Sequence, residues 1–130
     1  MGKSFRDLTV YKKAYELAMI VFELSKKFPV EERYALTSQI RRSSRSVCRA
    51  IGEGYRKRLY PNHFVSKISD ADMENSETQI SIDFAFSCGY ITKSENSEVR
   101  ARSEEVGKML NHMIENPERY QSKGRKGNKE

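Results

Sequence analysis

The residues best suited to chemistry in this chain are the basic ones between Arg33 and Arg58. That stretch holds eight basic residues and a single acid, Glu53. Arginine presents a planar fork of donors that engages phosphate oxygens in pairs, and the neighbouring Tyr55 and Tyr60 could stack on bases. The pattern predicts a surface that binds a polyanion, with RNA as the leading candidate. The residues predicted to contact nucleic acid are Arg41, Arg42, Arg45, Arg49, Arg56, Lys57 and Arg58.

An acidic run further along the chain offers a second interpretation of the same arginines. Between Asp70 and Asp83 there are five acids and no basic residue. These carboxylates could form ion pairs with the arginines, within one chain or between subunits, and a charge run is often only a solvated face. The sequence leaves both interpretations open. A steep loss of affinity with rising salt would favour phosphate binding, whereas a flat dependence would favour ion pairing.

The sequence lacks residues with the spacing of a catalytic or metal site. His63 and His112 fall outside any HExxH or Glu-x-x-His motif, and Cys48 has no adjacent base. Glu74 and Glu77 could share a metal ion, but exposure to solvent or pairing with arginine is the stronger expectation. A glycine-rich phosphate loop is also missing. We therefore expect a protein that is not an enzyme, with no catalytic residues, no metal and no cofactor.

The composition favours an all-helical protein. Of the 130 residues, 37% are hydrophobic and 32% are charged, with only 3 prolines and 7 glycines, a balance typical of amphipathic helices. The formal charge of +6 favours an anionic partner. Neither a Cys-x-x-Cys motif nor a secretory leader accompanies Cys48 and Cys88. No apolar run reaches the roughly 18 to 20 residues of a membrane span, so we expect a cytoplasmic protein with no membrane partner.

Apolar periodicity and capping residues divide the chain into four predicted helices. Their expected ranges are 7–28, 32–54, 61–88 and 92–116. Asp7 is the expected N-cap of the first helix, and Gly54 and Gly89 are expected to end the second and third. The fourth should open with a capping box that starts at Thr92.

The first predicted helix has an apolar face wide enough to contact two neighbours, as in a bundle. We therefore expect residues 1–116 to form an all-α, up-and-down four-helix bundle. Residues 117–130 show no apolar period and are expected to form a basic, disordered C-terminal tail.

Two helix faces carry the functional predictions. Along 32–54 the apolar positions form one stripe, and the arginines lie on the opposite side of the helical wheel. Along 61–88 a second apolar stripe, formed by Met73, Ile80 and Phe84, lies almost opposite the main seam. A lone bundle would leave this stripe in water. We interpret it as an oligomer interface.

Several strings of residues resemble a known family. The most specific is Leu36-Thr37-Ser38-Gln39-Ile40-Arg41-Arg42, and others are Phe5-Arg6-Asp7-Leu8, Gly89-Tyr90-Ile91 and Gly107-Lys108-Met109-Leu110. Over residues 5–114 the chain resembles the small bacterial four-helix bundle proteins encoded in intervening sequences of 23S ribosomal RNA genes. It departs from that pattern at Tyr11, Cys48 and Asn75, where tryptophan, proline and glutamate are usual.

The resemblance implies a ring-shaped homo-oligomer, with a pentamer expected, which agrees with the apolar stripe on 61–88. A related branch of similar proteins is the accessory subunit of diversity-generating retroelements, where it binds a reverse transcriptase and its template RNA through a basic surface. We therefore expect a non-catalytic, RNA-binding scaffold whose partners are further copies of itself, RNA and, in the retroelement case, a reverse transcriptase. The alternative is a protein-interaction adaptor whose basic face docks an acidic protein without nucleic acid.

Overall fold

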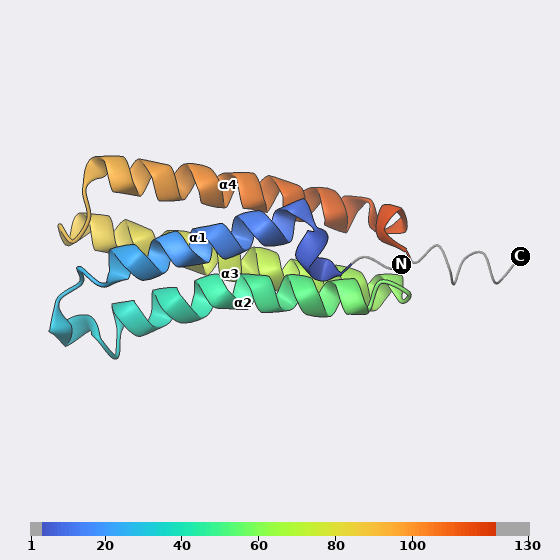
Figure 1. Cartoon of the computed structure of the whole chain (residues 1–130), viewed down its shortest axis with the longest axis horizontal. Helices are drawn as coiled ribbons and strands as arrows, with labels where there is room; N and C mark the ends of the chain where they lie inside the picture. The colour runs from blue at the N-terminus through green and yellow to red at the C-terminus, as the bar shows by residue number, and fades with distance from the viewer. Residues whose placement is uncertain (1–3, 122–130) are drawn as a thin grey trace, which may run out of the picture.

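The computed structural model describes residues 4–121, and over that range the chain is helical, without strands. Its four long helices run antiparallel in succession, as an up-and-down bundle (Figure 1). Their bounds are α1 Thr9–Ser25, α2 Leu36–Arg56, α3 Pro61–Ser87 and α4 Lys93–Glu115. The predicted all-α fold class with four helices is confirmed.

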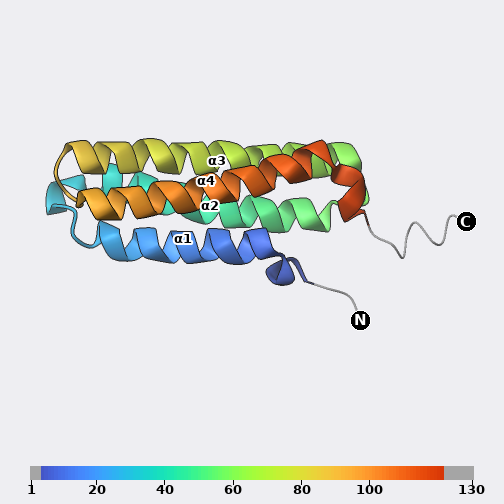
Figure 2. The ribbon, with the colours of Figure 1, turned by 90° about the horizontal axis from the view of Figure 1, so that it is seen from above.

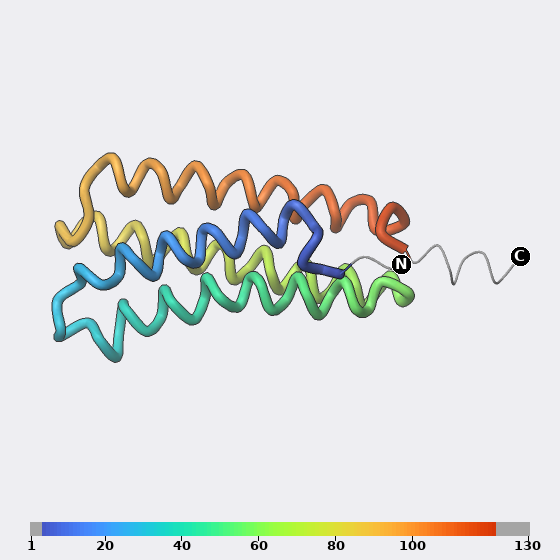
Figure 3. Tube along the Cα trace, viewed as in Figure 1, coloured from blue at the N-terminus to red at the C-terminus, as the bar shows by residue number. Residues whose placement is uncertain are grey.

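The helices occupy the corners of a square. Helix α1 packs against α2 and α4, and α3 packs against the same two neighbours (Figure 2). The connections from α1 to α2 and from α3 to α4 lie at one end of the bundle, and the connection from α2 to α3 lies at the other (Figure 3). The wide apolar face predicted for the first helix therefore does contact two helices. None of the helices in residues 4–121 is long and apolar enough to cross a membrane.

The start of α1 differs from the prediction. Asp7 is not its N-cap, because a 3-10 helix, Phe5–Asp7, precedes α1 and uses that aspartate itself. The Ser4 hydroxyl accepts a hydrogen bond from the Arg6 backbone N–H, and the Ser4 backbone N–H donates to Asp7 Oδ2, each at 3.0 Å. Asp7, the capping residue predicted for the long helix, therefore serves this short turn together with Ser4.

The link between α1 and α2 also contains a short turn. Helix α1 ends at Ser25, before the predicted Phe28, and the 3-10 helix Val30–Glu32 follows. Helix α2 begins at Leu36, later than the predicted Glu32, since Glu32 acts from outside the helix. Its Oε1 accepts from the Leu36 backbone N–H at 3.2 Å, and its Oε2 accepts from the Tyr90 hydroxyl at 2.8 Å.

The glycines at the predicted helix ends have different roles. Gly54 does not end α2, which continues to Arg56, and a Cβ at this position would lie 2.8 Å from Ile68 Cδ1. Gly54 therefore permits close approach of α2 and α3. Gly89 does follow the end of α3, with a φ of 80° that favours glycine. The capping box at the start of α4 is confirmed, since Thr92 and Glu95 bond each other's backbone N–H groups.

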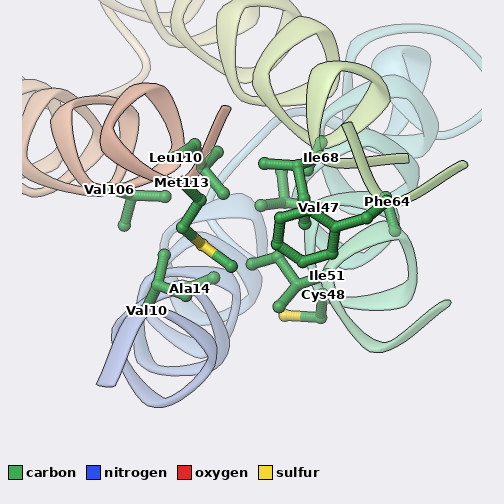
Figure 4. Packing of buried hydrophobic residues seen from close by; sticks show 12 residues of the cluster. Val10, Ala14, Val47, Cys48, Ile51, Phe64, Ile68, Val106, Leu110 and Met113 are labelled. Atoms are coloured by element: carbon green, nitrogen blue, oxygen red, sulfur yellow. The ribbon is translucent and has the colours of Figure 1, made fainter. Parts of the chain in front are cut away.

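The core has two apolar clusters separated by a polar layer. One cluster joins Val10 and Ala14 to Ile51, Phe64 and Leu110, among others (Figure 4). The other occupies the opposite end of the bundle. Between them, four fully buried polar side chains bond each other or the backbone. The Ser43 and Thr78 hydroxyls are 2.8 Å apart, and Asn75 and Ser103 exchange two hydrogen bonds of 2.9 Å.

The C-terminal boundary also needs correction. The disordered tail was predicted to begin at residue 117, but Pro117–Tyr120 forms a 3-10 helix. The ring of Tyr120 stacks on that of Phe64, with centroids 5.6 Å apart, so this turn covers one end of the core. The rest of the predicted tail, residues 122–130, lies outside the described residues.

Candidate nucleic-acid interface

The arginines of α2 lie outside the core, as the helical wheel predicts. The apolar positions Leu36, Ile40, Val47 and Ile51 are buried, as is Ser43. Arg45, Arg49 and Arg56 are exposed, as is Arg42, and Arg41 is half-buried. Because four residues make about one helical turn, Arg41, Arg45 and Arg49 form a row on one side of α2.

Arg41 and Arg45 lean toward α1. The Arg41 Nε–H donates to Ser25 Oγ at 2.7 Å, and the Arg41 guanidinium lies 4.7 Å from the centroid of the Phe22 ring. The Arg45 guanidinium lies 5.7 Å from the same centroid. Cation–π contacts of this kind hold a guanidinium in place without neutralising its charge. Both residues therefore stay cationic groups on the flank of α2 that faces α1.

Arg42 instead fits the ion-pairing interpretation, because it faces α3 and the acidic residues on that helix. Its Nη1 lies 3.8 Å from Glu74 Oε1, and its Nη2 lies 3.6 Å from Glu77 Oε1. Within residues 4–121, the other six predicted nucleic-acid contacts form no ion pair with a carboxylate. Ion pairing thus accounts for one of the seven residues.

The carboxylate that Arg42 approaches is partly withdrawn from water. Burial raises the pKa of Glu74, the nearby Glu77 raises it further, and Arg42 opposes both effects. Glu74 Oε1 is buried and accepts no hydrogen bond from the described residues. Arg42 therefore offsets the repulsion between two neighbouring carboxylates, which makes it a poor candidate for an outside phosphate.

The connector after α2 holds the remaining predicted contacts. Lys57 is exposed, whereas Arg58 folds back on Tyr55. The Arg58 Nη1–H donates to the Tyr55 carbonyl at 2.8 Å, and its guanidinium lies 4.0 Å from the centroid of the Tyr55 ring. That ring is therefore covered on one face, while Tyr60 stays exposed and tilts against His63. Of the two tyrosines predicted to stack on bases, Tyr60 is the more accessible.

The predicted oligomer interface is exposed in the single chain. Met73, Ile80 and Phe84 are each more than half exposed on the outer side of α3. Ile80 also borders the hollow that Arg42 and Glu77 line. The stripe exists as the wheel indicated, and its role in assembly stays a prediction.

Sequence reasoning missed the aromatic residues of α1. Tyr11, Tyr15 and Phe22 follow the helical spacing of Leu8 and Ala18, which by itself places them on the apolar face of α1. Tyr15 is nevertheless exposed, and the other two are half-buried beside the arginines. The available signal was the mixture of tyrosine with alanine and leucine on that face. Tyrosine suits a boundary between an apolar surface and water, because its ring packs while its hydroxyl stays wet.

The residues considered for catalysis or metal binding do not lie together. His63 is exposed on α3 and His112 is exposed on α4. Among residues 4–121, no three His, Cys, Asp or Glu side chains are placed to hold a metal ion. Burial raises the pKa of the Cys48 thiol to about 11, which disfavours the reactive thiolate. The expectation that the chain is not an enzyme stays a prediction.

Fold and surface together define a small helical bundle that exposes a row of cationic side chains on one helix. Residues 6–112 match the family model described as 23S rRNA-intervening sequence protein. The chain belongs to that family, which confirms the resemblance at this level.

One solved structure supports the same placement. It is the crystal structure of a protein of unknown function from the S23 ribosomal protein family of Bacteroides thetaiotaomicron. The two chains share 26% identity with a TM-score of 0.74, and the match covers 82% of this chain and 95% of that one. No curated protein sequence matches this chain significantly.

Proposed function

We propose that this protein is a non-catalytic, RNA-binding scaffold that engages phosphates through the arginine row of α2. The observation that carries the proposal is that Arg45, Arg49 and Arg56 are exposed and have no carboxylate partner within residues 4–121. Guanidinium groups spaced along one helix suit the repeating charges of a nucleic-acid backbone. Membership of a family named for 23S rRNA intervening sequences agrees with an RNA ligand.

We also propose that copies of the chain assemble through Met73, Ile80 and Phe84 into a ring, with a pentamer expected. Repetition of the arginine row around a ring would raise the affinity for a long RNA through multivalency. A role as the accessory subunit of a reverse transcriptase in a diversity-generating retroelement belongs to the same proposal. Exposure of three large apolar side chains on α3 supports the assembly step.

The test compares two double variants that remove the same charge from different faces. The first is Arg45→Gln with Arg49→Gln on α2, and the control is Lys93→Gln with Arg100→Gln on α4. Lys93 is exposed, and Arg100 pairs with Asp83 of α3. Binding to a fluorescein-labelled stem-loop RNA is followed by fluorescence anisotropy over a salt series.

We expect the α2 variant to bind more weakly and to lower the slope of log affinity against log salt by roughly 0.7 to 0.9 for each arginine. The α4 control should keep the wild-type slope, and thermal unfolding should show that both variants are folded. If the two variants lose affinity equally, only net charge matters and the proposal fails. If wild-type protein binds an acidic protein but no RNA, the adaptor function replaces it.

A further inference from the structure

A row of aromatic side chains runs along the outer side of α1, beside α2. The rings of Phe5 and Tyr11 meet edge to face with centroids 5.2 Å apart, and Tyr11 and Tyr15 follow at 6.1 Å. Phe22 continues the row two turns further along. Tyr15 is 54% exposed. The ring of Tyr15 is therefore accessible to an outside ligand.

The arginine row of α2 lies alongside these rings. Helices α1 and α2 run antiparallel (Figure 1). The Arg45 guanidinium lies 5.7 Å from the centroid of the Phe22 ring, and Arg49 and Arg56 line one hollow together with Tyr11 and Phe5. Rings from α1 and the preceding turn and guanidinium groups from α2 thus line the same seam. Aromatic and cationic groups in two parallel rows are what single-stranded nucleic-acid channels combine.

The seam between the two rows is hollow. Tyr11, Tyr15, Met19, Arg45 and Arg49 line a groove of about 280 Å³. It continues past Tyr11 into a second hollow of about 340 Å³, which extends to Phe5 and Arg56. The two hollows share three lining residues, so the groove follows the seam for several helical turns.

The carboxylates beside the groove are already engaged. Glu16 pairs with Arg102 of α4 at 3.2 Å, and Glu53 pairs with Lys67 of α3 at 3.2 Å. Arg102 and Lys67 both lie outside the groove. The arginines that line it therefore keep their charge for a ligand, and the groove is cationic and aromatic at once.

We propose that the groove between α1 and α2 binds a single-stranded segment of RNA, with bases stacked on Tyr15 and Tyr11 and phosphates held by Arg45 and Arg49. The inference rests on the proposed function and adds which form of RNA is recognised. Side chains one helical turn apart are separated by about 6 Å along the axis. Bases in a duplex strand are only about 3.4 Å apart and are paired, so only an unpaired, splayed strand can place successive bases on these rings.

The test uses two labelled RNAs with equal numbers of phosphates, an oligouridylate and a fully paired hairpin. Binding of each is measured by fluorescence anisotropy for wild type, Tyr15→Leu, Tyr15→Phe and Tyr34→Leu. Leucine keeps an apolar side chain but removes the ring, whereas phenylalanine keeps the ring. Tyr34 is the matched control because it is 88% exposed and lies in the link before α2, outside the groove.

We expect wild-type protein to prefer the oligouridylate over the hairpin. Tyr15→Leu should weaken oligouridylate binding by at least about fivefold, because a stacked base contributes about 1 to 3 kcal/mol. Its hairpin binding should be unchanged. Tyr15→Phe and Tyr34→Leu should both behave as wild type, and thermal unfolding confirms that each variant is folded.

Three outcomes overturn the proposal, and they separate it from the proposed function. If Tyr15→Leu has no effect while Arg45→Gln with Arg49→Gln weakens both RNAs, the protein binds RNA through phosphates alone and only the groove fails. Equal losses for Tyr15→Phe and Tyr15→Leu would show that ring stacking is not responsible. The third outcome is that neither RNA binds, that poly-glutamate binds, and that Tyr15→Leu weakens the binding of poly-glutamate. The groove would then bind an acidic protein segment, and both proposals would be wrong.

Discussion

The two flanks of α2 meet their neighbours in different ways. On the flank that faces α3, Arg42 approaches two carboxylates, and the buried hydroxyls of Ser43 and Thr78 bond each other. On the flank that faces α1, Arg41 and Arg45 lie over the ring of Phe22. One helix thus has a flank whose charge is compensated internally and another whose charge is not.

The difference shows that the neighbouring helix decides what an arginine on α2 can do. Arg41 and Arg42 are adjacent in sequence, yet one contacts a serine and a phenylalanine and the other contacts glutamates. Carboxylates on α3 pair with the guanidinium of Arg42, so its charge is used within the folded chain. Aromatic residues on α1 position a cation and leave its charge available.

The closeness of packing on the two flanks can be tested with Gly54→Ala and Gly52→Ala. A Cβ at Gly54 would lie 2.8 Å from the fully buried Ile68, whereas a Cβ at Gly52 would meet Phe5 at an ordinary 3.4 Å. Both changes gain about 1 kcal/mol of helix propensity, so that gain cancels between them. We expect Gly54→Ala to be less stable than Gly52→Ala by about 1 to 3 kcal/mol.

Urea unfolding of the two variants gives this difference directly. Gly52→Ala is the internal control, since it should be as stable as wild type or slightly more stable. Equal free energies of unfolding would mean that Ile68 moves aside without cost. The packing of α2 against α3 at Gly54 would then be no closer than the packing of α2 against Phe5 at Gly52.

Much of this architecture follows from the sequence. Apolar periodicity located four helices, and the Thr92 capping box and Gly89 marked real boundaries, because these signals are local. The predicted helix starts at Asp7 and Glu32 were wrong: Asp7 caps a short 3-10 turn, and Glu32 ends another such turn and bonds the first residue of α2 from outside the helix. A single-helix wheel places the arginines outside the core but cannot tell which neighbouring helix each one faces. For that reason the ion pairs of Arg42 and the exposed position of Tyr15 beside the arginines emerged only with the structure.

The half-buried carboxylate of Glu74, on the α3 flank, should affect stability in a pH-dependent way. Burial holds the pKa of Glu74 above its ordinary value of 4.5. As the pH rises above that ordinary value, the unfolded chain loses this proton before the folded chain does. The folded state then binds more protons than the unfolded state, and its stability falls. We expect Glu74→Gln to gain stability relative to wild type as the pH rises above about 4.5. Urea unfolding across this range measures the gain.

Glu77→Gln is the matched control for that experiment. It removes the same charge beside the same guanidinium, but from a carboxylate that is more exposed than Glu74. The gain with rising pH should therefore be smaller for Glu77→Gln. A constant difference between Glu74→Gln and wild type at every pH would show that burial of Glu74 carries no energetic cost.

The smallest effect is expected when Arg42 is replaced. Its ion pairs are long and its side chain is 58% exposed, so solvent screens them and Arg42→Gln should cost at most about 1 kcal/mol of stability. Because its charge is already shared with two carboxylates, RNA affinity should keep its wild-type salt slope. Arg49→Gln should instead lower that slope by roughly 0.7. If Arg42→Gln lowers the slope as much as Arg49→Gln does, RNA displaces the carboxylates, and the two flanks of α2 are equivalent toward a polyanion.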